Sequence, residues 1–571
     1  MIAHRVEGPR AKTFPSPEST RPTMMGTRYV VSAGHHLAAQ AAASVLDRGG
    51  NAIDAGVAGG LVSNVVLPDM CNFGGVAPII VRNAGSDQVW SVAGVGTWGR
   101  EATLAAFRER YGDHMPEGPG NSVVPAAPHA WLTALERWGT WSFGDVASAS
   151  IELALEGFAL DRRAAYAIGQ FGREWDTTRE VFFRNSREPA QGDVVRQPNL
   201  GELLLKLAAA EQGPNRRDAI RSARRAFYEG EVAQLIVEAN RAGGGWLTAE
   251  DLSEFQADVS LAVGRPYQEW QVYTPDTWCQ GPALLQTLAI LDDFDLAQLG
   301  HNTADYIHVL AEALKLAFSD REAYYGDPRF VDVPLEYLLS NEHATELRGR
   351  IDMSTALPSL ATTRRPLMRR YDTTYICVVD RDGNAFSATP SDTLDGGPIV
   401  PELGIVVSPR GLQSRLDPKH PSVLAPGKRP RLTPSPALAM RAGAGRDSSV
   451  CVFGSPGGDV ILQAMLQAFL NLLHFDMTPQ QAVEAPRVGM FSSPNSFYPH
   501  DSTDRLLMVE ARVAMEVKRD LARRGHDIGS WPEWEFDAGG VSLGLDVHPP
   551  SAERVLAAAA DPRRSTYAIG R

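Results

Sequence analysis

Apolar residues along the chain fall into short runs of strand length and longer runs with helical spacing. The run Tyr29-Val30-Val31-Ser32 predicts a strand, and it leads into predicted helices over about 36–47 and 51–66. Residues 79–81 and 88–92 predict a hairpin, because a Gly-Ser-Asp turn separates them. The start of the chain is therefore predicted to combine strands with a pair of helices.

The pattern changes near residue 370. From about 124 to 350 it is mostly helical, and residues 303–325 form a long amphipathic segment. A basic, polar stretch over 362–370 predicts an exposed loop. Directly after it, residues 373–379 are β-branched and apolar, and residues 385–388 follow an Asp-Gly turn as the partner strand. A helix-rich part is thus followed by a strand that starts abruptly at a Thr-Thr pair.

The composition is that of an ordinary globular protein. The chain has 571 residues, of which 44% are hydrophobic and 22% charged, so disorder as the main state is excluded. A net charge of −13 disfavours nucleic acid as a partner, because phosphate binding requires a basic face. The four cysteines have no C-x-x-C spacing, and the histidines are scattered, so we expect no metal site and no organic cofactor.

The hydrophobic pattern of the sequence predicts neither export nor a membrane span. The first thirty residues hold charges and prolines but no apolar signal segment, so we expect no Sec export and a cytoplasmic location. Residues 1–27 predict a loose leader. The most apolar stretch, 460–475, has Gln463, Gln467 and Asn471 at every fourth position. One narrow polar stripe on an apolar helix is typical of a buried core helix.

Thr373, at the start of the abrupt strand, is a candidate nucleophile. A threonine hydroxyl is weak alone, but the free α-amino group of an N-terminal threonine can serve as its base. That amine has an unperturbed pKa of about 7.7–8 and accepts a proton near neutral pH. The scheme requires the Asp372–Thr373 bond to be cut first, by attack of the same hydroxyl on the preceding carbonyl. The alternative interpretation is that the Thr-Thr pair simply favours a strand.

Gly454-Ser455-Pro456-Gly457-Gly458, directly before the apolar helix, is a candidate oxyanion site. Two adjacent glycines allow two backbone N–H groups to turn toward one point. At the start of a helix such donors can stabilise a developing negative charge. The alternative interpretation is a strand-to-helix turn without a ligand.

Taken together, these segments resemble the γ-glutamyltranspeptidase family of N-terminal-nucleophile hydrolases, from about Tyr29 to about Met508. Each motif is weak alone, but seven in the right order over this length are specific. The matching segments are Gly49 to Ala55, Phe73-Gly74-Gly75, Gly244 to Leu252, Lys315 to Pro328, Thr373 to Ala385, Gly427 to Pro430 and Gly454 to Gly458.

The resemblance implies one α+β domain, a four-layer αββα sandwich with two stacked antiparallel sheets covered by helices. It implies that the precursor cuts itself between Asp372 and Thr373, into a large-subunit part over 28–372 and a small-subunit part over 373–571. The two chains should stay associated, because strands from both build one core.

The resemblance also implies roles for individual residues. Thr373 would be the nucleophile and its own amine the base, and Gly457 and Gly458 would form the oxyanion hole. Ser391, eighteen residues after the nucleophile, would orient the Thr373 hydroxyl. The reaction is acyl transfer from an amide to water or to an amine, with glutathione-like substrates by family.

The residues expected to bind the substrate differ from those of γ-glutamyl enzymes. In the family an arginine after the Gly-Gly hairpin binds the substrate carboxylate, but the stretch 91–98 holds none, and Arg100 lies several residues beyond. A bidentate guanidinium–carboxylate contact cannot be replaced by Val or Gly. Two serines that help to hold this carboxylate correspond to Leu432 and Thr433.

The residues that bind the α-amino group of the substrate in the family are changed as well. The usual Asn corresponds to Thr393, and the usual Gln and Asp correspond to Arg410 and Gln413. We therefore hypothesise that Arg410 binds an acidic group of a substrate without a glutamyl α-amine; the alternative is a surface arginine. Together with Tyr375 in place of the usual His, these changes resemble a divergent branch that includes oxamate-amidohydrolase-like proteins.

The sequence leaves three candidate functions for this chain. The first is a self-processing γ-glutamyl hydrolase or transferase. The second is an amidase or acylase for another small acidic amide, with an oxamate-like or dicarboxylic acyl group. The third is an unprocessed protein that binds a ligand without catalysis. In none of them is nucleic acid or a membrane an expected partner.

Overall fold

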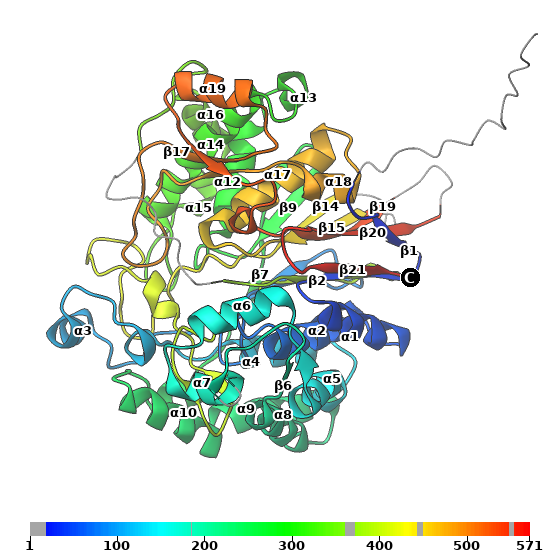
Figure 1. Cartoon of the computed structure of the whole chain (residues 1–571), viewed down its shortest axis with the longest axis vertical. Coiled ribbons are helices and arrows are strands. Elements are labelled where there is room, and N and C mark those ends of the chain that lie inside the picture. Colours follow the sequence, from blue (N-terminus) through cyan, green and yellow to red (C-terminus); the bar gives the residue numbers. More distant parts are fainter. Residues whose placement is uncertain (1–18, 184–185, 360–371, 442–448, 548–552) are drawn as a thin grey trace, which may run out of the picture.

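A computed structural model describes residues 19–183, 186–359, 372–441, 449–547 and 553–571. Two seven-stranded antiparallel sheets lie face to face, and helices cover the outer face of each sheet (Figure 1). The arrangement is the predicted four-layer αββα sandwich. The basic stretch predicted over 362–370 lies outside the described residues.

The two sheets are named after their central strands. The β10 sheet has the order β21 (Tyr567–Gly570), β2 (Tyr29–Ala33), β10 (Ile376–Asp380), β11 (Ala385–Ala388), β3 (Ile79–Arg82), β4 (Val89–Val92) and β7 (Val259–Leu261). The β15 sheet has the order β1 (Met24–Gly26), β20 (Val555–Ala560), β19 (Ser542–Val547), β15 (Ser449–Gly454), β14 (Ala437–Arg441), β9 (Trp270–Thr274) and β8 (Val263–Tyr267).

Side chains of β10 show how the layers form. Alternate residues of a strand point to opposite faces of its sheet. Ile376 and Val378 join the core beneath the helices, whereas Cys377 and Val379 join the core between the two sheets. Both faces of β10 are therefore apolar, which explains why its sequence is a continuous apolar run rather than an alternating one.

The helices form the two outer layers. The layer on the β10 sheet contains α1 (His36–Asp47), α2 (Ala52–Val66), α4 (Ala127–Trp138), α5 (Phe143–Glu156), α8 (Pro198–Ala209), α9 (Arg216–Tyr228) and α10 (Glu231–Ala242). The layer on the β15 sheet contains α12 (Gly281–Leu291), α14 (Ala304–Tyr324), α16 (Asn341–Arg348), α17 (Ile461–His474) and α19 (Met515–Arg523). The predicted helices at 36–47, 51–66 and 303–325 are confirmed within one residue at each end.

The polar stripe of α17 bonds to a neighbouring strand. Gln467 accepts from the Val488 N–H at 3.0 Å and donates to the Val488 carbonyl at 2.9 Å. Gln463 makes the same pair of bonds with Met490. The two glutamine side chains thus bond to β16 (Val488–Met490) as a neighbouring strand would. These bonds satisfy the polar groups that the buried helix carries. The prediction of a core helix is confirmed.

Three sequence predictions need correction. Met24–Gly26 forms β1 and pairs with β20, so the fold begins inside the predicted leader. The region 124–350 is mostly helical, but it also contains β7 and β8, at sheet edges, and β9, between β8 and β14, which the helical pattern concealed. The predicted strand at 373 begins only at Ile376, because Thr373 forms an isolated bridge with Ser391 before the ladder starts.

Each sheet contains strands from both sides of the Asp372–Thr373 bond. β10 pairs with β2 on one side and with β11 on the other. β14, in turn, pairs with β9 and β15. A cut at residue 372 would leave these ladders intact, because each part supplies strands that the other part flanks.

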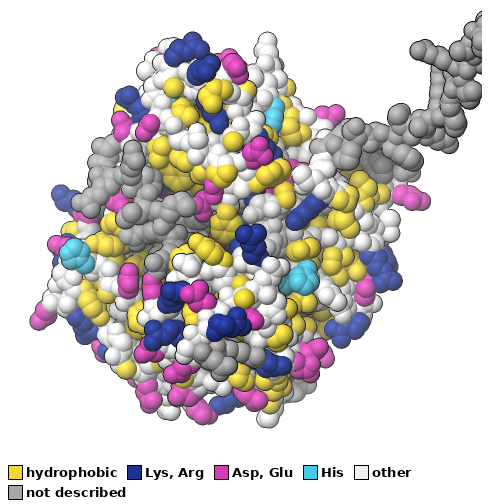
Figure 2. Space-filling model, in the orientation of Figure 1, with side chains coloured by type: hydrophobic (Ala, Val, Ile, Leu, Met, Phe, Trp, Pro, Cys, Tyr) yellow, Lys and Arg dark blue, Asp and Glu magenta, His cyan; other side chains and the backbone are white. Residues whose placement is uncertain are grey.

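On the face in Figure 2, basic and acidic side chains are interspersed rather than gathered in one patch. Among the described helices, none is both long enough and apolar enough to cross a bilayer.

Candidate active site

Thr373 lies immediately before β10, at the edge where the two sheets meet the loops. The Thr374 N–H donates to the Pro390 carbonyl at 3.0 Å, which brings the segment beside residues 390–391. The Thr373 and Ser391 hydroxyl oxygens are 2.8 Å apart, and both residues are buried. The predicted partner of the nucleophile is therefore within hydrogen-bond distance of it.

The peptide bond between Asp372 and Thr373 is held by hydrogen bonds on both sides. Ser391 Oγ donates a hydrogen bond of 2.9 Å to the Asp372 carbonyl oxygen. The Asp372 carboxylate accepts from the Thr373 N–H at 2.8 Å. The Thr373 hydroxyl, a donor to the carbonyl oxygen and an acceptor for the N–H group thus surround one peptide bond.

The Phe73-Gly74-Gly75 motif makes this closeness possible. A Cβ on Gly75 would lie 2.4 Å from the Ser391 carbonyl oxygen and 2.9 Å from the Asp392 Cβ. The Ser391 N–H donates to the Val76 carbonyl, and Asn72 Nδ2 donates to the Asp392 carbonyl. The motif is thus a docking surface for the Ser391-Asp392 turn, and only glycine fits at position 75.

Arg410 is a buried residue, so the interpretation as a surface arginine is wrong. Its side chain is 2% exposed and forms an ion pair with Asp392, whose other oxygen accepts from Ser408 at 2.6 Å. A second guanidinium nitrogen donates to Ser391 Oγ. Asp392 has φ +86°, a conformation that is strained for a residue with a Cβ and that such a network can maintain.

The pairing with Asp392 changes what Arg410 can do. A cation already neutralised by a buried carboxylate is a weak anchor for a second carboxylate. Its contact with Ser391 instead places positive charge behind the hydroxyl that donates to the Asp372 carbonyl. This geometry suits an orienting role next to the nucleophile.

Hydrogen bonds continue from Arg410 toward the glycine loop. Arg410 donates to Gln413 at 3.3 Å, and Gln413 donates to Thr433 Oγ1 at 3.0 Å. Gln280 then donates to the Thr433 and Gly458 carbonyls, at 2.8 and 3.1 Å. Five residues that sequence motifs suggested as site members, Thr373, Ser391, Arg410, Gln413 and Thr433, are therefore joined in one network.

Thr393 lies next to this network but outside it. Its side chain is buried, and its hydroxyl has no hydrogen-bond partner among the described residues. A buried hydroxyl without a partner is uncommon and is a natural contact for a bound ligand.

Gly457 and Gly458 have the conformation expected of backbone donors. Their φ angles are +126° and +59°, in the region that favours glycine. Among the described residues, neither N–H is matched with a hydrogen-bond acceptor. Gly454, at the start of the segment, packs on the Tyr375 ring, since a Cβ there would lie 2.2 Å from it. This contact sets the loop beside the start of β10.

Three site residues had no local sequence signal: Asp392, Gln280 and Arg564. Arg564 forms an ion pair of 2.5 Å with Asp372 and is separated from it by 192 residues. Near it, burial raises the pKa of the Asp537 carboxyl to about 6, while the positive charge of Arg564 opposes the rise. Neither spacing nor composition connects these positions, because only the folding of both sheets brings them together.

The stretch that carries the carboxylate-binding arginine in γ-glutamyl enzymes is apolar here. Ala93 and Val95 belong to a buried cluster with Leu432. Arg100 is held elsewhere, by Asp251 at 3.1 Å and Glu254 at 2.8 Å, with its side chain 45% exposed. Arg100 therefore does not replace the missing group.

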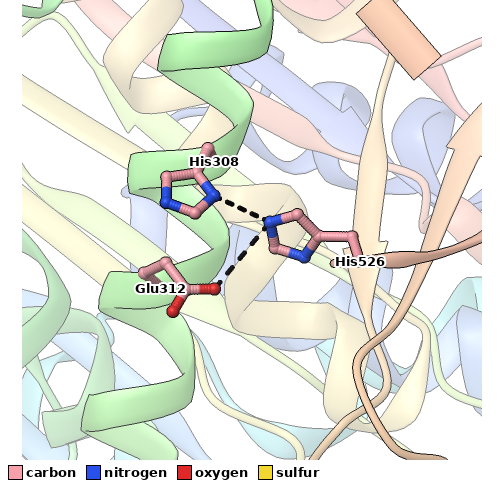
Figure 3. A group of neighbouring side chains, drawn as sticks. All are labelled: His308, Glu312 and His526. Atoms are coloured by element: carbon pink, nitrogen blue, oxygen red, sulfur yellow. Dashed lines mark hydrogen bonds and ion pairs between the residues drawn. The ribbon is translucent and has the colours of Figure 1, made fainter. Parts of the chain in front are cut away.

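One group of metal-ligand types occurs among the described residues. His308, Glu312 and His526 converge at the face of α14, as Figure 3 shows, and His308 and His526 are 218 residues apart in sequence. The Lys315 ammonium donates a hydrogen bond of 2.7 Å to Glu312 and so supplies the positive charge beside this carboxylate.

The same cluster also bonds to residues 352–357. His308 bonds the Asp352 carbonyl at 2.9 Å, and Glu312 accepts from the Leu357 N–H at 2.7 Å. We interpret the cluster as a buried polar contact that fixes residues 352–357 rather than as a metal centre, because Lys315 pairs with Glu312, and His308 and Glu312 bond to that segment. Among the described residues, His526 Nδ1 has no hydrogen-bond partner.

Comparisons with known proteins extend over the whole fold. The chain matches the family described as Gamma-glutamyltranspeptidase over residues 38–571. The glutathione hydrolase-like YwrD proenzyme of Bacillus subtilis (strain 168) is 30% identical over 556 residues, covering 96% of this chain and 99% of that protein. The acylase ACY 1 proenzyme of Pseudomonas sp. (strain SE83) is 29% identical over 539 residues, covering 88% of each.

A solved structure agrees in fold. The cephalosporin acylase from Bacillus halodurans superposes with a TM-score of 0.83 at 27% identity, covering 99% of both chains. The proteins that this chain resembles are thus named as glutathione hydrolases in some cases and as acylases in others.

Proposed function

The chain belongs to the gamma-glutamyltranspeptidase family, and we propose that it is a self-processing amidohydrolase whose nucleophile is Thr373. The observation that carries the proposal is the set of contacts around one peptide bond. Thr373 Oγ1 lies 2.8 Å from Ser391 Oγ, which donates to the Asp372 carbonyl oxygen at 2.9 Å.

Self-cleavage begins with an N-to-O acyl shift. Thr373 Oγ1 bonds to the Asp372 carbonyl carbon, the carbon–nitrogen bond breaks, and the hydroxyl proton passes to the leaving nitrogen. Ser391, with the Arg410 cation behind it, stabilises the negative charge that develops on the carbonyl oxygen. This shift frees the α-amino group of Thr373. Water then hydrolyses the ester, which releases the Asp372 α-carboxylate and restores the Thr373 hydroxyl.

The mature enzyme repeats this chemistry on an external amide. The Thr373 amine takes the hydroxyl proton as Oγ1 attacks, and the proton then goes to the departing amine. The N–H groups of Gly457 and Gly458 are the proposed oxyanion donors. Water or an amine receives the acyl group in the second half of the reaction.

An acylase specificity is favoured over a γ-glutamyl one. The apolar stretch at Ala93 and Val95, together with the buried Arg410–Asp392 pair, replaces the groups that grip a glutamyl head in the family. We infer a small acidic amide as substrate, with acylase relatives as the appropriate precedent. Hydrolysis of glutathione-like compounds is the alternative against which this acylase specificity is to be tested.

Cleavage and catalysis are tested by intact mass. The purified protein and its Thr373→Ala variant are measured under denaturing conditions. We expect fragments of 372 and 199 residues from the wild type, the smaller beginning at Thr373, and a single chain from the variant. A wild type that stays uncut at 61.9 kDa after long incubation contradicts the proposal and leaves an inactive binding protein.

The two chains are proposed to remain associated in the cytoplasm after cleavage. The ladder of β10 between β2 and β11 supports association, because each side of the cut supplies one of its partners.

A further inference from the structure

The first acyl group that Thr373 encounters is that of Asp372. Self-cleavage and turnover use the same hydroxyl, so both carbonyl carbons must reach the same position relative to Oγ1. The atoms attached to the Asp372 carbonyl carbon therefore indicate where the acyl part of a substrate lies. The precursor contains, in this sense, its own substrate analogue.

The side chain of Asp372 reaches a built binding site. Arg564 Nη1 forms an ion pair of 2.5 Å with Asp372 Oδ2, and the Arg564 side chain is only 3% exposed. Arg564 Nε donates to the Phe536 carbonyl at 3.0 Å, and the guanidinium lies on the Phe536 ring. A stacked guanidinium with one fixed hydrogen bond is pre-oriented for a carboxylate.

From this contact we propose that Arg564 binds the carboxylate of a dicarboxylic monoamide, with succinyl amides as the preferred class. In Asp372, two carbons separate the carbonyl carbon from the carboxylate carbon, which is the spacing of a succinyl group. An oxamoyl group is too short to span this distance, and a glutaryl group is one carbon too long. The inference rests on the proposed function, because it takes Thr373 as the nucleophile.

Cleavage makes Asp372 the last residue of the large chain. Among the described residues, Asp372 is the sole ion-pair partner of Arg564. The other cations near the site are engaged, Arg410 with Asp392 and Arg163 with Asp69. The inference requires that the Asp372 side chain leaves this position after the cut, and Arg564 is then the buried cation that a substrate carboxylate can pair with.

The reaction itself is ordinary amide hydrolysis. Thr373 Oγ1 bonds to the succinyl carbonyl carbon as the amide carbon–nitrogen bond breaks, and the amine leaves with the proton. Water then releases succinate and restores the hydroxyl. Arg564 does not touch the reacting atoms; it is a binding residue that sets the position of the acyl chain.

The test compares p-nitroanilides of succinyl, glutaryl, butyryl and γ-glutamyl groups on the processed wild type. Butyryl matches succinyl in length but lacks the charge. We expect kcat/KM for succinyl to exceed that for butyryl and γ-glutamyl by about tenfold or more, which is the scale of a charge-assisted hydrogen bond. Equal or greater rates with butyryl would overturn the inference.

Variants assign the preference to Arg564. Arg564→Met should lower kcat/KM for succinyl by about tenfold or more and leave the butyryl rate within about twofold, because only succinyl uses the charge. Arg523→Met removes an arginine that is 76% exposed on α19 and serves as the matched control. An Arg564→Met enzyme that keeps the succinyl preference contradicts the inference.

Three further outcomes can be distinguished. If Arg564→Met fails to process, competition by succinate against butyrate on the wild type decides, and equal inhibition by the two acids overturns the proposal. If the wild type cleaves itself but shows no preference for acidic acyl groups, Arg564 is wrong as the anchor and the amidohydrolase assignment stands. If no cleavage occurs, the proposed function itself fails.

Discussion

Ser391 donates a hydrogen bond of 2.9 Å to the carbonyl oxygen of Asp372, the residue on the far side of the predicted cut. The Ser391 hydroxyl is thus engaged with the bond to be broken as well as with the nucleophile. It occupies the position of an oxyanion donor for self-cleavage, before the Thr373 amine exists.

Removal of the Ser391 hydroxyl should slow self-cleavage. Loss of one oxyanion donor typically costs about 10²- to 10³-fold in rate. We expect Ser391→Ala to accumulate uncut precursor in a mass-spectrometric time course, and Ser391→Thr to restore processing. Ser63→Ala, which removes a buried hydroxyl bonded to the Gly59 carbonyl in α2, is the control. Normal processing in Ser391→Ala would exclude the proposed role.

Breaking the Arg410–Asp392 pair should destabilise the fold. Both side chains are buried, so Arg410→Ala leaves an unpaired carboxylate, and the expected cost is about 3–5 kcal/mol. Thermal unfolding is the measurement. Arg100→Ala, which disrupts an exposed pair with Asp251, should change the melting temperature little. Equal effects of the two variants would show that burial is not what makes the Arg410 pair important.

Gly75→Ala should impair processing through a steric clash. The added methyl would lie 2.4 Å from the Ser391 carbonyl oxygen and would displace the turn that carries Ser391. We expect slower cleavage and a lower melting temperature. Gly85→Ala, where the nearest atom is 3.7 Å from the new Cβ, is the matched control and should behave as the wild type. A Gly75→Ala protein that cleaves normally would show that the turn can move.

Asp537 should make stability depend on pH. Burial raises its folded-state pKa to about 6 from the ordinary 3.8, so the folded protein holds this proton more tightly than the unfolded chain. The stabilisation is fully present below about pH 4 and is lost as the pH rises through about 6. Asp537→Asn should therefore raise the melting temperature at pH 7.5 and have little effect at pH 4. A variant effect that is constant with pH would contradict the shifted pKa.

Cleavage should not separate the two chains. Wild-type protein that gives two fragments under denaturing conditions is expected to elute as one species of unchanged mass in native size-exclusion chromatography. The reason is that β10 and β11 of the small chain pair with β2 and β3 of the large chain, and β14 pairs with β9, so separation would expose both sheets. Elution of a free small chain would exclude an interlocked core.

Local pattern was sufficient for much of the fold. The helices α1, α2 and α14 lie within one residue of their predicted bounds, and caps such as Asn51, which accepts from the Ile53 and Asp54 N–H groups, mark where they begin. The segment 303–325 was predicted to be amphipathic, but residues 306–318 of α14 are all buried, so this part of the prediction is wrong. The strands β7 to β9 were missed because they are short and partly exposed and lie within a helical region. Their position is decided by pairing with strands far away in sequence, which no local window contains.

The sequence by itself determined the order of motifs, the candidate Thr373 and the glycine loop, because each depends on residue type and spacing, and the family resemblance added Ser391 as the partner of Thr373. The tertiary structure alone decided that Arg410 is buried against Asp392 and that Arg564 meets Asp372 across 192 residues. Charge pairing in a core depends on which side chains two folded sheets bring within a few ångströms. That information lies in the packing of distant segments and in no stretch of the chain taken alone.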